Sequence, residues 1–75
     1  MMQKTYVVEK TFEKTDFTQN PLPAGEYEAC IFISCNFSGV DLSGIQFAEC
    51  EFRGCNLSTA KLLKTALKEV QFKDC

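Results

Sequence analysis

The 75-residue sequence contains no histidine and no tryptophan, and its apolar residues do not form a long run. Without histidine, an imidazole can serve neither as a general base nor as a metal ligand. No stretch approaches the 18 or more apolar residues of a membrane span, and no signal peptide opens the chain. We therefore expect a cytoplasmic protein without a membrane partner. The excess of one charge is also small, since 8 Lys and Arg stand against 10 Asp and Glu, which argues against direct binding to nucleic acid.

Large apolar residues recur at every fifth position from residue 12, and all seven phenylalanines belong to this class of central residues. The class consists of Phe12, Phe17, Leu22, Tyr27, Phe32, Phe37, Leu42, Phe47, Phe52, Leu57, Leu62, Leu67 and Phe72. A second class, two residues before each centre, holds small or β-branched side chains and all five cysteines. From residue 30 it consists of Cys30, Cys35, Val40, Ile45, Cys50, Cys55, Ala60, Thr65, Val70 and Cys75.

A period of five fits neither a strand, which alternates every 2 residues, nor an α-helix, which repeats every 3.6. A chain that turns by about a quarter circle per unit points both classes at a common axis. Four units then close a square coil, and residues in successive coils stack at about 4.8 Å. The columns match like with like, as in Phe12, Phe32, Phe52 and Phe72. The sequence therefore predicts an all-β, parallel solenoid of about three coils in a single domain.

The successive units from residue 30 resemble the pentapeptide repeat A(D/N)LXX. They read CIFIS, CNFSG, VDLSG, IQFAE, CEFRG, CNLST, AKLLK, TALKE and VQFKD. The resemblance covers residues 26–75 strongly and residues 10–25 loosely, and it implies a right-handed quadrilateral parallel β-helix. We expect an N-terminal cap and imperfect first coil at residues 1–25 and a pentapeptide-repeat β-helix at residues 26–75. The segment TFEKTDFTQNPLPAGEYEACIFISCNFSG also resembles the N-terminal coils of the quinolone-resistance pentapeptide repeat proteins.

The two ends of the predicted solenoid differ. Near the N-terminus, residues 5–8 have high strand propensity, and Pro21 and Pro23 remove two backbone donors, so this part of the first coil can form a non-pairing edge. At the other end, Cys75 occupies an inward position and no cap follows it. We expect the open C-terminal coil either to continue in a longer rod or to be covered by a second copy in a homodimer.

Two segments allow alternative interpretations. Residues 58–70 also fit an amphipathic helix, although the five-residue register runs through them without a break. Four cysteines have a spacing that resembles a zinc site, namely Cys30, Cys35, Cys50 and Cys55. Val, Ile and Ala fill the same class of positions elsewhere, which favours cysteine columns packed in the core. The phenylalanine column is likewise predicted to lie inside the coil and not on a base-stacking surface.

The sequence contains no nucleophile with a base partner and no Gly-rich phosphate loop. We therefore predict that the protein is not an enzyme, and we assign no catalytic, cofactor-binding or metal-binding residue and no cofactor. The first functional hypothesis is a protein-interaction or structural scaffold. The alternative, implied by the family resemblance, is the N-terminal part of a DNA mimic that binds a topoisomerase such as gyrase and protects it from quinolones.

One acidic face bears on the DNA-mimic hypothesis. The coil register places Glu26, Glu28, Glu49 and Glu69 on one face, with Lys68 among them. Three coils span only about 15 Å, over which B-DNA would carry roughly nine charges. The net charge of −2 is small by comparison, which favours the scaffold for a chain of this length.

Overall fold

The structure is a computed structural model that describes residues 5–75, and this part of the chain contains strands and turns but no helix. The strands are β1 (Thr5–Val8), β2 (Thr11–Glu13), β3 (Gly25–Glu28), β4 (Ile31–Ile33), β5 (Ile45–Ala48), β6 (Glu51–Arg53), β7 (Ala66–Lys68) and β8 (Gln71–Lys73). They form two parallel four-stranded sheets, sheet A in the order β1-β3-β5-β7 and sheet B in the order β2-β4-β6-β8. The predicted all-β solenoid is confirmed, and the alternative helix at residues 58–70 does not form.

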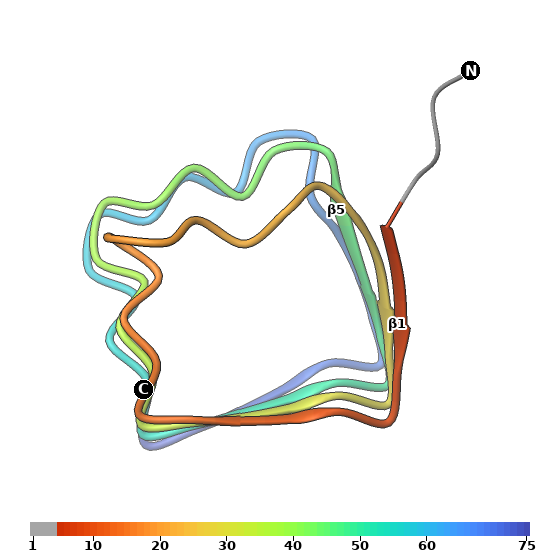
Figure 1. Cartoon of the computed structure of the whole chain (residues 1–75), viewed down its shortest axis with the longest axis horizontal. Helices are drawn as coiled ribbons and strands as arrows, with labels where there is room; N and C mark the ends of the chain where they lie inside the picture. The colour runs from red at the N-terminus through yellow and green to blue at the C-terminus, as the bar shows by residue number, and fades with distance from the viewer. Residues whose placement is uncertain (1–4) are drawn as a thin grey trace.

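The coil is four-sided, with sheets A and B on two adjoining sides (Figure 1). Seen from the N-terminal end, the chain runs clockwise as it recedes, which is the right-handed sense. On each side, a residue pairs with the residue one coil later, twenty positions along the chain. Examples from the four sides are Thr5 with Gly25, Phe12 with Phe32, Asn36 with Asn56, and Asp41 with Lys61.

The corners of the coil depend on residues in the left-handed backbone region, two positions after a central residue or, for Glu9, after Val7, which pairs with the central Tyr27. Their φ angles lie between 50° and 82°. These residues are Glu9, Lys14, Ala29, Ser34, Gly39, Gly44, Glu49, Gly54, Thr59, Lys64, Glu69 and Asp74. Most of these residues are not glycine, although the left-handed region favours glycine. The hydrogen bonds and packing of the coil therefore hold them in this conformation. The segment with the two prolines lacks such corners and follows a different path from the later coils (Figure 1).

The core is a set of stacked columns along the axis. The rings of Phe32 and Phe52 are fully buried and stack at 4.7 Å, and Phe12 and Phe72 extend the column at 4.8 and 5.1 Å. Phenylalanines on adjoining sides meet these rings edge to face. Tyr27 is also buried, and its hydroxyl donates a hydrogen bond of 2.6 Å to a backbone carbonyl in the proline segment. Apolar burial along one axis therefore holds the coils together.

The cysteines are free thiols and belong to these columns, as the core interpretation predicted. Cys30, Cys35, Cys50 and Cys55 are buried, whereas Cys75 is exposed. The Cys55 thiol donates to a backbone carbonyl one coil earlier at 3.2 Å. Burial raises the pKa of the Cys55 thiol to about 11, so it stays protonated near neutral pH.

The outermost coils are less well covered than the middle of the solenoid. Leu62, Leu67 and Phe72 of the last coil are all more than two-fifths exposed, whereas the equivalent side chains one coil earlier are buried. At the other end, Phe12 is only partly buried. Residues 1–4 of the expected N-terminal cap lie outside the described residues.

Candidate functional site

The acidic residues that the register was expected to gather lie at the corner between sheets A and B. Glu28 ends β3, and Glu49 and Glu69 are the corner residues that follow β5 and β7. Together with Lys68 they line one open hollow beside Ala48. We call Glu28, Glu49, Lys68 and Glu69 the acidic corner. The structure thus brings these four residues together, and Glu26 lies beside them on the outer face of β3.

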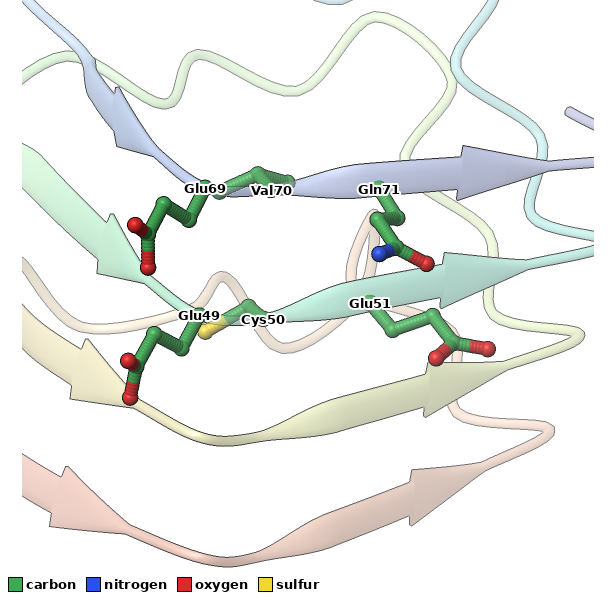
Figure 2. A pocket seen from close by; sticks show the side chains of 6 residues that line it. All are labelled: Glu49, Cys50, Glu51, Glu69, Val70 and Gln71. Atoms are coloured by element: carbon green, nitrogen blue, oxygen red, sulfur yellow. The ribbon is translucent and has the colours of Figure 1, made fainter.

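The position of Glu49 and Glu69 follows from the corner geometry. Both residues have φ angles near 54°, which directs their side chains away from the core, and their carboxylates lie one above the other (Figure 2). The same corner position accepts Ala29 one coil earlier, so the coil does not require a carboxylate there. Stacking like charges in successive coils is unfavourable. The acidic corner is therefore not explained by the needs of the fold.

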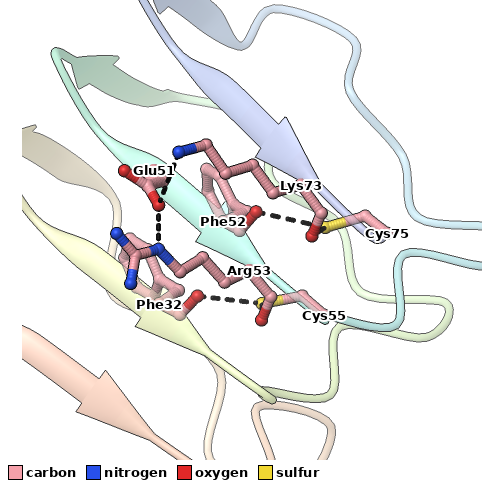
Figure 3. A network of polar contacts seen from close by, with 7 residues as sticks. All are labelled: Phe32, Glu51, Phe52, Arg53, Cys55, Lys73 and Cys75. Carbon is pink, nitrogen blue, oxygen red and sulfur yellow. Dashed lines mark hydrogen bonds and ion pairs between the residues drawn. The ribbon is translucent and has the colours of Figure 1, made fainter.

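A second hollow lies next to the acidic corner and is lined by Glu49, Cys50, Glu51, Glu69, Val70 and Gln71 (Figure 2). Glu51 differs from its acidic neighbours because it is paired with two cations. Its carboxylate contacts Nε of Arg53 and lies 3.6 Å from Nζ of Lys73 (Figure 3). The hydrogen bond from Arg53, with the nearby Lys73 ammonium, lowers the pKa of Glu51. Glu51 is therefore largely neutralised, whereas within residues 5–75 Glu28, Glu49 and Glu69 form no ion pair.

The polar residues of the other two sides serve the turns of the coil. In each case a side-chain oxygen accepts a hydrogen bond from the backbone N–H two residues later, at 2.9–3.0 Å. The pairs are Asp16 with Thr18, Asn36 with Ser38, Asp41 with Ser43, and Asn56 with Ser58. This Asx turn explains why Asp or Asn precedes many centres. Sequence reasoning missed the role, although the recurring Asp/Asn-x-Ser/Thr spacing was a visible signal.

The described part of the chain offers little for chemistry of other kinds. Within residues 5–75, no group of three Cys, Asp or Glu side chains is arranged to hold a metal ion. None of these residues forms a helix that is long and apolar enough to cross a membrane. The feature that stands out is an open acidic surface on a rigid coil, which suits recognition of another molecule.

Comparison with known proteins identifies the repeat. The family model described as the pentapeptide repeat region matches residues 26–75. The matched segment contains the whole acidic corner and all five cysteines. No curated protein matches the chain.

Proposed function

This chain belongs to the pentapeptide repeat family, whose members are generally non-catalytic, and from this we propose that it is a scaffold that binds a protein partner through the acidic corner. One observation carries the proposal. Glu28, Glu49 and Glu69 converge on one open hollow, although the corner position of Glu49 and Glu69 also accepts Ala29 and so does not require an acidic residue. The partner is expected to present basic side chains to this surface.

The stiffness of the coil favours such binding. Corner residues with a coil after them are fixed by a backbone hydrogen bond to that coil, as in Glu49, whose N–H donates to the carbonyl of Lys68 at 2.8 Å. A surface that is already ordered loses little conformational entropy when a partner binds. Because Glu49 and Glu69 are exposed, the attraction depends on charge and weakens as salt is added.

Charge reversal at one corner position tests the scaffold proposal, and the chain offers a matched control. Glu49→Lys changes the acidic corner, whereas Asp74→Lys makes the same charge change at another left-handed corner with nearly the same φ angle. Both proteins are immobilised beside the wild type, and proteins retained from a cell extract of the source organism are quantified by mass spectrometry. We expect a partner that the wild type and Asp74→Lys retain and Glu49→Lys loses. If no retained protein distinguishes the two variants, the proposal is wrong.

We propose a type II topoisomerase as a second, narrower candidate for the partner. The resemblance of residues 11–39 to the quinolone-resistance proteins favours it, as do the carboxylates of Glu49 and Glu69, which lie one above the other in successive coils. The charge is a constraint, because the acidic corner includes Lys68 and the whole chain carries a net charge of only −2. Imitation of a DNA segment by this chain is therefore expected to be weak.

A supercoiling assay with purified DNA gyrase and a fluoroquinolone tests the narrower candidate. The expected result is that the wild-type chain restores supercoiling in the presence of the drug and that Glu49→Lys restores less. Binding to gyrase is measured in parallel by biolayer interferometry. A chain that neither binds gyrase nor restores supercoiling excludes the topoisomerase while leaving the broader scaffold proposal to the extract experiment.

A further inference from the structure

Two isoleucines lie on the outer face of sheet B, where a water-facing strand normally carries polar residues. They flank Phe32 on β4, and Phe32 is 0% exposed because it points into the core. Since side chains alternate along a strand, Ile31 and Ile33 both point outward, and both are partly exposed. Neither residue is needed for the core. Their place in the middle of a flat face, between β2 and β6, is therefore a candidate contact surface.

The strands on either side of β4 place opposite charges next to Ile33, whereas Ile31 lies between Thr11 and Glu51. The register aligns Glu13 of β2, Ile33 of β4 and Arg53 of β6 in one column across the sheet. With strands about 4.8 Å apart, Glu13 and Arg53 lie about equally far from Ile33, on opposite sides of it. Both charged residues are exposed. The column is therefore an acidic, an apolar and a basic side chain in a row.

We propose that this face of sheet B is a docking surface for a second copy of the chain, with the two rods antiparallel. The two-fold axis lies in the interface and runs along β4. Rotation about this axis places Ile33 against the partner's Ile33 and Ile31 against the partner's Ile31. It also places Glu13 against the partner's Arg53, and Arg53 against the partner's Glu13. The face is thus complementary to itself, because apolar side chains meet apolar side chains and each acidic side chain meets a basic one.

The antiparallel arrangement is favoured over a parallel one by the charges already paired within the chain. A two-fold axis along the rod would place Glu51 against the partner's Arg53. Within residues 5–75, Glu51 is already paired with Arg53 and Lys73, whereas Glu13 has no ion pair. The parallel arrangement would only exchange one ion pair for another. The antiparallel arrangement gives Glu13 an ion pair that it lacks within the described residues, with Arg53 shared between its own Glu51 and the partner's Glu13.

The size of the face determines how strong the association is. The overlap covers β2, β4 and β6 of each copy, which is about 10 Å across the strands and about 10 Å along them. This is well below the roughly 800 Å² per partner of a stable interface. The dimer is therefore weak, and it forms at high protein concentration and low salt.

Two charge reversals and their mixture test the proposal by sedimentation equilibrium over a concentration series. Glu13→Arg places two arginines opposite each other in the dimer, and Arg53→Glu places two glutamates opposite each other. Each variant alone is expected to dimerise at least about tenfold more weakly than the wild type. An equimolar mixture of the two restores both opposite-charge contacts, so we expect heterodimers of twice the 8.5 kDa chain mass. Circular dichroism of each variant checks that the coil is intact.

Three outcomes would overturn the proposal. The first is a wild-type chain that stays monomeric at 1 mM in low salt. The second is a dimer that Glu13→Arg leaves unchanged, which would indicate the parallel arrangement or pairing through another surface. The third is a mixture of the two variants that remains monomeric although both are folded and the wild type dimerises. This surface is separate from the acidic corner, so its failure would not affect the proposed scaffold function.

Discussion

Truncating Phe52 to alanine is the most direct perturbation of the solenoid. Phe52 is 1% exposed and lies in the phenylalanine column between Phe32 and Phe72, at ring separations of 4.7 and 5.1 Å. Two further rings meet it edge to face, Phe47 at 5.2 Å and Phe37 at 5.7 Å. The truncation therefore removes contacts with two coils and two adjoining sides at once.

The expected cost follows from this burial. Replacing a fully buried phenylalanine by alanine costs about 3–5 kcal/mol, because apolar contact is lost and a cavity remains. A domain of this size has a total stability of about 4–11 kcal/mol. Collapse of the cavity is limited because hydrogen bonds between parallel strands hold the coils at a fixed spacing. Phe52→Ala is therefore expected to lower the free energy of unfolding by a large fraction of its total.

Urea unfolding followed by circular dichroism measures this effect, and Phe72→Ala is the matched control. Phe72 belongs to the same column and its ring stacks on that of Phe52, but Phe72 is 44% exposed. Its truncation is expected to cost about half as much as that of Phe52. Equal losses for the two variants, or a midpoint for Phe52→Ala close to that of the wild type, would refute the reasoning that the column is the core.

Three further predictions concern single groups. Gly25→Ala should strongly destabilise the first coil, because a Cβ there would lie 2.2 Å from the backbone oxygen of Thr5, and urea unfolding measures the loss. At pH 8 a thiol reagent should label exposed Cys75 quickly and buried Cys55 only on unfolding. Burial raises the pKa of the Cys55 thiol in the folded state to about 11, so the contribution of this thiol to stability is complete below the unfolded thiol pKa and is lost as the pH rises to about 11. The hydrogen bond from Arg53 and the nearby Lys73 ammonium lower the pKa of Glu51 in the folded state. The contribution of Glu51 to stability is therefore present above the unfolded carboxyl pKa and is lost as the pH falls through the folded value. Glu51→Gln should reduce this loss of stability at acid pH.

Much of the fold could be predicted because burial leaves a periodic mark on the sequence. A central residue in one coil is Phe52, and the residues one coil away on either side are Phe32 and Phe72, so the stack is visible before any coordinates. The same register correctly placed Glu28, Glu49 and Glu69 beside Lys68. The five-residue period, the stacked columns and the outward faces all follow from which side chains are buried. Burial of apolar side chains is the largest favourable term in folding.

Other features could not be predicted because they depend on torsions and contacts with small individual energies. The left-handed corners are occupied by residues as different as Ala29, Glu49 and Thr59, so no residue type marks them reliably. The pairing of Glu51 with two cations, which separates it from the acidic corner, depends on side-chain conformations on two strands.

The sequence alone therefore determined the all-β solenoid, its coil length and its core columns, because every fifth residue must avoid water. The tertiary structure decided which outward residues are free and which are already paired. It left Glu49 and Glu69 as open carboxylates, paired Glu51 with two cations, and left Ile33 partly exposed between Glu13 and Arg53. The physical reason is that burial leaves a periodic pattern of apolar residues in the sequence, whereas surface contacts depend on residues of adjacent coils that are distant in the sequence.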